Sequence, residues 1–323
     1  MVAPMLVRVS SPSHVYAGVV DLHGGLGRVC GLLGFALQEP RVVVEAEDAP
    51  GGLAVEDPWS GGDALAYAEE ACRLYRCEGA RVRVLEAPPR HAGLGFTAQL
   101  ALSIAWAVAA LHRRRFDPAE AAVGLELGLE AGVGVNAFTY GGFIVEGGFP
   151  STSLGRRVPP LVYRGVVPRS WRVVAVLPSR PLRDPGSREL PGCTPGPLES
   201  EEEACVSSRL VLMGLLPAAS EGDWARASAF LQEVNDRTRS RLAPGGDGEY
   251  CCGEAELVAG ALRAAGAPCV CQSGLGPMVY SLAPAGVTRR LLAAARRALG
   301  EAGGGSAWVT GVDNRGAHIS VAK

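Results

Sequence analysis

A glycine turn between a predicted strand and a predicted apolar helix is the stretch of this sequence best suited to chemistry. Gly93-Leu94-Gly95 separates the alternating segment 81–87 from the apolar segment 98–111. Free backbone N–H groups and the positive end of a helix dipole meet at such a turn, which favours a bound anion. Glycine lets a phosphate approach the backbone closely, and Thr97 adds a hydroxyl. The turn lacks the lysine of a P-loop and the third glycine of a dinucleotide fingerprint, so a plain tight turn before a core helix is an equal alternative.

A second glycine-rich stretch follows at 131–148, where six of 18 residues are glycine. So many conformationally permissive positions beside a predicted anion loop favour a surface that faces a ligand, with Gly132, Gly134 and Asn136 as its first members. Hairpins and bulges also use glycine, which is the structural alternative.

Composition excludes several classes of protein. The chain has 323 residues, 48% of them hydrophobic and 20% charged, with a net charge of −2. This balance is typical of a globular protein and argues against bulk nucleic-acid binding, which requires a basic face. The apolar segment 98–111 is too short to cross a membrane, and residues 1–8 do not form a signal peptide. We therefore expect a cytoplasmic protein with neither a nucleic-acid nor a membrane partner.

The cations and the thiols limit the chemistry further. Lys323 is the only lysine, which excludes a catalytic or P-loop lysine in the body of the chain, whereas arginine can grip a phosphate with two parallel hydrogen bonds. The nine cysteines form no Cys-x-x-Cys pair, so a structural zinc site is not expected. An odd count without a secretion signal predicts mostly reduced thiols, or one or two disulfides if the source is a hyperthermophile.

Periodicity predicts helices and strands in both halves, which indicates an α+β fold. Expected strands lie at 5–9, 15–22, 35–37, 41–46, 81–87, 171–177, 307–310 and 317–321. Expected helices lie at 63–77, 98–111, 118–130, 199–216, 222–240, 254–266 and 288–299. A boundary in the Pro- and Gly-rich segment 149–170 divides the chain into domains 1–155 and 156–323. The long loop 178–197 is a candidate lid or diphosphate clamp, with a solvated surface loop as the alternative.

Several motifs, in one order along the chain, resemble those of the GHMP kinase superfamily. The segment from Pro89 to Ala98 is similar to the superfamily's Pro-x-x-x-Gly-Leu-Gly-Ser-Ser-Ala, with Phe96 in place of the first serine. Within the superfamily the chain most resembles the β-ribofuranosylaminobenzene 5′-phosphate synthases of methanopterin biosynthesis. The further segments that carry this resemblance are Asp21 to Arg28, Thr97 with Gln99, Gly132 to Val145, Gln272 to Tyr280, and Asn314 to Ala317.

This sequence departs from the synthase motifs at three places where a ligand could be affected. His14 stands where the family tends to have arginine, and Glu130 lies in a segment where the family tends to have Arg-Arg-Ser. Gly274-Leu275 replaces Ser-Trp.

The resemblance implies a two-domain fold of the GHMP kinase type, with a glycine-loop domain at 1–155 and a ferredoxin-like domain at 156–323. It implies a decarboxylating transfer of phosphoribosyl from phosphoribosyl diphosphate to 4-aminobenzoate or 4-hydroxybenzoate, with release of CO2 and diphosphate. Such a pentosyltransferase would use Mg²⁺ and small-molecule substrates, and we expect a homodimer.

Mapped residue by residue, the resemblance also nominates the site. The expected catalytic residues are Asp21, Gln272 and Ser273. The expected substrate and phosphate ligands are Arg28, Gly93, Leu94, Gly95, Thr97, Gln99, Gly132, Gly134, Asn136, Gly276 and Arg315. The expected Mg²⁺ ligands are Asp21 and, with weaker support, Glu146 and Asp313.

Two other functions stay open at this point. An ATP-dependent small-molecule kinase would use the same glycine loop for a triphosphate. A homologue that binds the ligand without turning it over would fit the departures at His14 and Glu130.

Overall fold

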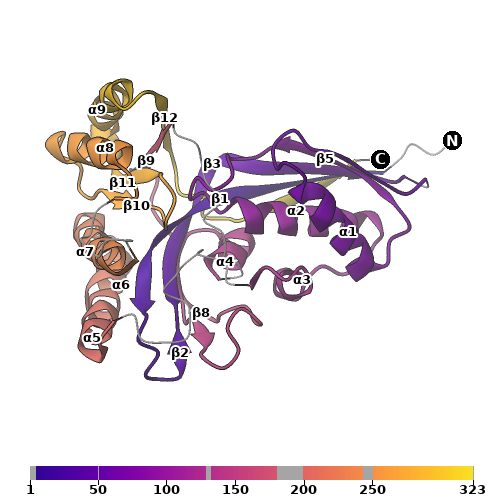
Figure 1. Cartoon of the computed structure of the whole chain (residues 1–323), viewed down its shortest axis with the longest axis horizontal. Helices are drawn as coiled ribbons and strands as arrows, with labels where there is room; N and C mark the ends of the chain where they lie inside the picture. Colours follow the sequence, from indigo (N-terminus) through magenta and orange to yellow (C-terminus); the bar gives the residue numbers. More distant parts are fainter. Residues whose placement is uncertain (1–4, 50, 129–131, 180–198, 243–249, 323) are drawn as a thin grey trace.

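Two long antiparallel strands, β1 (Leu6–Asp21) and β3 (Gly31–Glu47), run through the molecule and connect all of its layers (Figure 1). The computed structural model describes residues 5–49, 51–128, 132–179, 199–242 and 250–322. The sequence predicted two short strands in each of these places, with gaps at 10–14, which holds three serines, and at 38–40. The serines are buried with partners instead: Ser11 Oγ accepts from Ser103 Oγ at 2.9 Å, and Ser13 Oγ donates to the Pro40 carbonyl at 2.6 Å.

The first sheet has seven strands and takes members from both ends of the chain. Its order is β13-β1-β3-β5-β4, and β6 pairs with both β3 and β8. The added strands are β4 (Leu53–Glu56), β5 (Ala80–Glu86), β6 (Phe143–Glu146), β8 (Leu161–Gly165) and β13 (His318–Ala322). A small pair, β2 (Arg28–Val29) with β7 (Phe149–Pro150), lies beside the hairpin. Since β8 and β13 join this sheet, the expected division at residue 155 does not separate the two sheets in sequence.

Helices α1 to α4 cover one side of this sheet (Figure 1). They are α1 (Asp63–Tyr75), α2 (Phe96–Leu111), α3 (Pro118–Gly124) and α4 (Val133–Tyr140). Helix α2 is buried on nearly every face, as its uniformly apolar sequence predicted, and it packs against β1 and β3. Asp117 caps α3 by accepting from two backbone N–H groups, also as expected, but α3 ends at Gly124 rather than at 130. The glycine-rich stretch forms α4 and β6, because its glycines lie where elements touch.

The second sheet, in the order β10-β11-β9-β12, lies at one end of the molecule (Figure 1). Its strands are β9 (Trp171–Pro178), β10 (Cys271–Gln272), β11 (Val279–Pro284) and β12 (Gly305–Thr310). The helices of this half are α5 (Glu201–Leu210), a π-helical turn (Val211–Leu215), α6 (Leu216–Ser220), α7 (Trp224–Leu242), α8 (Gly253–Ala264) and α9 (Thr288–Glu301). Helices α8 and α9 share one core with this sheet, while α7 shares another with both sheets.

The structure also bears on the expectations for disulfides and for membrane-spanning helices. Cys72 and Cys77 form a disulfide at the end of α1, which agrees with the alternative of one or two disulfides. Within the described ranges, no helix combines the length and the apolar character needed to cross a bilayer. Most of the predicted loop 178–197 falls outside the described residues, and so does Glu130.

Candidate functional site

The glycine turn places the open N-terminus of α2 at the centre of the candidate site. Gly93 and Gly95 both have positive φ angles, of 85° and 66°, and Gly95 is the N-cap of α2 with no side-chain cap. The first N–H groups of a helix have no acceptor inside the helix, so these point out of the turn. Leu94 is buried under the turn, whereas Gly93, Gly95 and Thr97 are half-buried. The geometry is that of an anion site built from backbone groups.

Phe96 explains how the first helical position tolerates a residue so unlike serine. Its side chain is only 5% exposed and packs in the core between α2 and the sheet. The side chain therefore points away from the turn and leaves the space in front of the backbone N–H groups open. The departure at Phe96 changes the core rather than the surface that faces an anion.

The third glycine motif, on the loop between β10 and β11, lies directly against this turn. Ser273 Oγ donates to the Gly93 carbonyl at 2.5 Å and accepts from the Tyr16 amide at 3.0 Å. Gly276 comes so close that a Cβ there would lie 2.6 Å from the Gly93 nitrogen. Ser273 thus joins three segments that are far apart in sequence, and only glycine fits at position 276.

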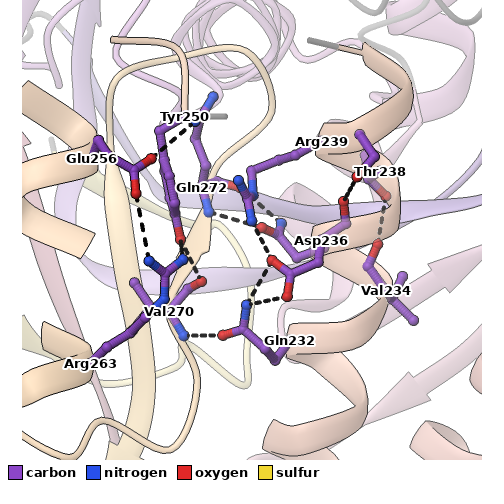
Figure 2. A network of polar contacts seen from close by, with 12 residues as sticks. Gln232, Val234, Asp236, Thr238, Arg239, Tyr250, Glu256, Arg263, Val270 and Gln272 are labelled. Atoms are coloured by element: carbon purple, nitrogen blue, oxygen red, sulfur yellow. Dashed lines mark hydrogen bonds and ion pairs between the residues drawn. The ribbon is translucent and has the colours of Figure 1, made fainter. Parts of the chain in front are cut away.

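Gln272, nominated as catalytic, is held by its neighbours. Its side-chain oxygen accepts from the Cys251 amide at 2.9 Å, its side-chain nitrogen donates to the Gly274 carbonyl at 3.1 Å, and the residue is 4% exposed. Figure 2 shows Gln272 beside Arg239 and Tyr250, between α7 and α8. The Arg239 guanidinium lies over the Tyr250 ring at 4.1 Å from its centroid. These contacts suit Gln272 to holding the shape of the loop at 273–278 between β10 and β11, which we call the motif-three loop.

Beneath the turn lies a buried polar pair, His14 and Gln99. A Cβ on Gly95 would lie 1.9 Å from the His14 ring, so the ring sets the height of the turn. The Gln99 side-chain nitrogen donates to the Gly134 carbonyl at 2.9 Å and lies 3.2 Å from His14 Nδ1. Complete burial lowers the pKa of His14 to about 3, so the ring is neutral at physiological pH. If Nδ1 accepts from the amide, the ring proton lies on Nε2, which has no hydrogen-bond partner in the described part of the chain.

The second nominated stretch, at the start of α4, is used mainly for packing. Gly134 packs against α2, where a Cβ would lie 2.6 Å from Ala98 Cβ. Asn136 is 4% exposed, and its side chain donates to the Gly132 carbonyl at 3.3 Å, one turn back in the helix. Both residues therefore turn inward, which differs from the expected ligand-facing surface.

Glu146 is a buried acid at the N-terminal end of α4. A Cβ on Gly132 would lie 2.6 Å from Glu146 Oε1, and the residue is 1% exposed. Burial raises the pKa of Glu146 well above 4.5. Burial therefore disfavours the ionised form of this carboxyl in the folded protein.

The other nominated residues lie away from the turn. Asp21 is at the far end of β1, five residues or about 16 Å of strand beyond Tyr16. Its Oδ1 accepts from the backbone N–H groups of His23 and Gly24. Arg28 donates from Nε to the Gly147 carbonyl at 2.6 Å and from Nη2 to the next carbonyl at 2.5 Å. These groups hold the tip of the hairpin.

Arg315 and Asp313 lie at the opposite end of α4 from Gly132. A Cβ on Gly141, which follows the helix, would lie 2.7 Å from the Arg315 amide nitrogen. Asp313 Oδ2 is paired with Arg41 Nη1 at 2.6 Å, and its Oδ1 accepts from the Arg315 amide. Eight helical residues span about 12 Å, so this cluster is remote from the start of α4.

A protein-made magnesium cage is absent from the residues described here. Asp21, Glu146 and Asp313 do not converge, and no group of three His, Cys, Asp or Glu side chains in the described ranges could hold a metal ion. Mg²⁺ commonly binds through one or two carboxylates together with substrate phosphates. These residues therefore do not fit a preformed ion, and we derive no step through one.

Sequence reasoning missed Asn235 and Thr238 on α7. Asn235 is 2% exposed, and its side chain bonds to both β1 and β10. Thr238 Oγ1 accepts from the Val19 amide at 3.0 Å. Their spacing of three places them on the helix face that also carries Leu231 and Val234, which was the available signal.

Comparison with known proteins confirms the resemblance that the motifs indicated. The β-ribofuranosylphenol 5′-phosphate synthase of Methanothermobacter thermautotrophicus is 29% identical, covering 96% of this chain and 98% of the relative. The synthase of the same name from Archaeoglobus fulgidus is 28% identical, covering 86% of this chain and 88% of the relative. No family model matches the sequence.

Solved structures give the same answer for the fold. Homoserine kinase from Cytophaga hutchinsonii superposes with a TM-score of 0.71 at 18% identity, covering 98% of this chain and 97% of the kinase. Mevalonate kinase from L. major superposes with a TM-score of 0.68 at 16% identity, covering 94% of this chain and 95% of the kinase. The chain has the fold of the GHMP kinases, and over most of its length it resembles β-ribofuranosylphenol 5′-phosphate synthases.

Proposed function

We propose that this protein is a pentosyltransferase that moves phosphoribosyl from phosphoribosyl diphosphate onto an aromatic acid, releasing CO2 and diphosphate. Relatives that match nearly the whole chain are named for a ribofuranosylphenol product, which favours 4-hydroxybenzoate over 4-aminobenzoate as the acceptor. The observation that carries the proposal is Ser273, which bonds to the glycine turn at Gly93 and to strand β1 at Tyr16 and so joins two of the family motifs to the central strand.

The proposed reaction balances without a redox step or a covalent enzyme intermediate. The bond between C1 of the ribose and the diphosphate oxygen breaks, and its electron pair leaves with the diphosphate. A bond forms between that carbon and the ring carbon that carries the carboxylate. The ring–carboxylate bond then breaks, CO2 leaves, and its bonding pair restores the aromatic ring.

This reaction requires stabilisation of an anionic leaving group more than it requires a nucleophile. Gly93, Gly95 and Thr97 offer backbone N–H groups at the positive end of α2, where a phosphate would bind. His14 beneath them is neutral, so the attraction comes from backbone dipoles and not from that side chain. Mg²⁺ stays a separate proposal, as an ion that arrives bound to the substrate diphosphate, and removal of divalent ions with EDTA would test it.

The test is release of labelled CO2 from carboxyl-¹⁴C 4-hydroxybenzoate and from carboxyl-¹⁴C 4-aminobenzoate, each with phosphoribosyl diphosphate, alongside an ATP-consumption assay. We expect CO2 release without ATP use, and its loss in Gly93→Ala. A Cβ at that position would lie 2.6 Å from the Ser273 carbonyl oxygen. ATP consumption with a small alcohol and no CO2 from either benzoate would replace the proposal with a kinase. Ligand binding with neither activity would replace it with an inactive binder.

The finer expectations that accompany this activity are also proposals. We infer a cytoplasmic homodimer that serves methanopterin biosynthesis. Light scattering of the purified protein would test the dimer, and a monomer at micromolar concentration would contradict it.

A further inference from the structure

Helix α7 lies along an edge of β1 where side chains take the place of a neighbouring strand. Between residues 16 and 22, five main-chain groups of β1 and the residue after it bond to side chains from distant segments. The pairs are Tyr16 N with Ser273, Ala17 O with Asn235, Val19 N with Thr238, Val20 O with Ser208, and Leu22 N with Glu199. The position of this edge therefore depends on side-chain length as well as on backbone pairing.

Asn235 is the one member of this set that also bonds to β10. Its Nδ2 donates to the Ala17 carbonyl at 3.1 Å and to the Gln272 carbonyl at 3.0 Å, while its Oδ1 accepts from the Gln272 amide at 3.0 Å. The residue is 2% exposed. Both amide hydrogens and one oxygen lone pair are used, so the side chain has one orientation.

The packing around Asn235 shows that this contact is tight. A Cβ on Gly18 would lie 2.7 Å from Val234 Cγ1 and 3.1 Å from Thr238 Oγ1. Glycine at position 18 thus lets α7 approach β1 at a bulge that lies between Tyr16 and Gly18. The close approach brings the Asn235 amide within reach of both strands at once.

We infer that Asn235 is a positioning residue, which fixes Gln272 and Ser273 at the height where Ser273 closes onto Gly93 and Tyr16. Its side chain bonds to Ala17 and to Gln272 and not to the glycine turn, so it acts through the main chain of Gln272. Its effect on turnover rests on the proposed function, but the placement of Ser273 does not.

Neither alanine nor aspartate can make the three hydrogen bonds of the Asn235 side-chain amide. Alanine leaves two buried carbonyls and one buried N–H without their partner, and an unpaired buried group is unfavourable. Ionised aspartate can accept from the Gln272 amide but cannot donate to either carbonyl, and its charge repels both. Both substitutions are therefore expected to free the start of the motif-three loop.

The kinetic test is a double-mutant cycle between Asn235→Ala and Ser273→Ala. A displacement of about 1 Å at a reacting group can cost on the order of 100-fold in rate, so we expect kcat/KM to fall by 10- to 100-fold in Asn235→Ala. If Asn235 acts through Ser273, the double variant loses no more than the larger of the two single losses. Multiplying losses would overturn the inference.

A matched control separates positioning from general loss of stability. Ser228 lies on the same helix two turns earlier, is fully buried, and donates to the Leu282 carbonyl at 3.3 Å, away from the glycine turn. Ser228→Ala is expected to lower the midpoint of thermal unfolding while kcat/KM changes less than threefold. If Asn235→Ala also keeps kcat/KM within threefold at a similar thermal shift, Asn235 is structural and the inference fails.

Hydrogen exchange tests the geometry without any turnover. In Asn235→Ala, and in Asn235→Asp if the first variant does not fold, we expect faster amide exchange at 15–19 and 271–276 and also at 93–96. Unchanged exchange at 93–96 would refute the inference even if the variant were inactive. Wild-type protein that releases no CO2 would refute the proposed function but leave this outcome decisive for Asn235.

Discussion

The stability of the folded protein should fall in acid, because the fold resists protonation of the histidine beneath the glycine turn. His14 is fully buried, and burial lowers its pKa from 6.5 to about 3. Between these two values the unfolded chain takes up a proton that the folded chain does not. The free energy of unfolding therefore falls as the pH falls, by about 1.4 kcal/mol for each pH unit. From pH 6.5 to pH 4.5 the loss is roughly 2 to 3 kcal/mol, a large part of the 5–15 kcal/mol typical of a protein.

The variant that isolates this effect is His14→Asn. The asparagine side-chain oxygen can take the place of Nδ1 and accept from Gln99 Nε2, which now lies 3.2 Å from the ring nitrogen, but asparagine does not titrate. Urea unfolding of both proteins at pH 7.5, 6.5, 5.5 and 4.5 measures the difference. The substitution also removes packing, so only the change of the difference with pH carries the test, not its size at pH 7.5.

We expect the difference between wild type and His14→Asn to shrink by about 2 to 3 kcal/mol between pH 6.5 and 4.5. Carboxylates also contribute to acid unfolding, but they contribute equally to both proteins and cancel. Parallel curves would show that His14 keeps its ordinary pKa. The ring would then be exposed to water or paired with an acid, and the reasoning about a neutral support under Gly95 would be wrong.

Three further predictions follow from the same geometry. Gly95→Ala should lose diphosphate binding and at least 2 kcal/mol of stability. The left-handed backbone there disfavours a Cβ, and this Cβ would also collide with the His14 ring. The control Gly222→Ala has a φ of 76° but open space around it, so it should lose only about 1 to 2 kcal/mol. The stability of the wild type should fall by about 1.4 kcal/mol for each pH unit above 4.5, because the buried Glu146 carboxyl resists ionisation. Urea unfolding of Glu146→Gln should not show this fall, and an unchanged slope would refute the raised pKa. Phe96→Ser, which restores the family's residue, should cost about 3 to 5 kcal/mol in chemical denaturation by opening a cavity, and a neutral result would place Phe96 outside the core.

Local patterns predicted most of the elements because each element has a single dominant signal. The apolar run of α2 and the Asp-Pro start of α3 are such signals, and both were confirmed. The sequence did not predict β1 as one continuous strand, because the contacts that stabilise its middle come from distant segments. Ser11 and Ser13 look like a break in β1, yet they are buried against Ser103 and Pro40 from other elements. No window of sequence contains those partners.

The candidate site shows the same division between local and distant information. The motifs predicted Gly93, Ser273 and Gly276 as residues of one site, and the structure brings these three into contact. Asn235 was missed because a single asparagine in a charged helix is usually solvated. Its role depends on the carbonyl of Ala17 and on both main-chain groups of Gln272, which only the fold brings together.

The arginines show why residue type alone cannot assign a phosphate ligand. A guanidinium suits phosphate, but it equally suits carbonyls and carboxylates, and these are more abundant in a folded chain. Arg28 binds two carbonyls, Arg41 pairs with Asp313, and Arg90, three residues before Gly93, pairs with Asp63 at 3.0 Å. The glycine turn has the uncapped helix N-terminus that the sequence predicted, whereas Arg28, Arg41 and Arg90 use their guanidinium groups to hold the fold. Under the proposed function, a phosphate at the turn is attracted mainly by aligned backbone dipoles. The positions of His14, Ser273 and, by our inference, Asn235 set the position of these dipoles.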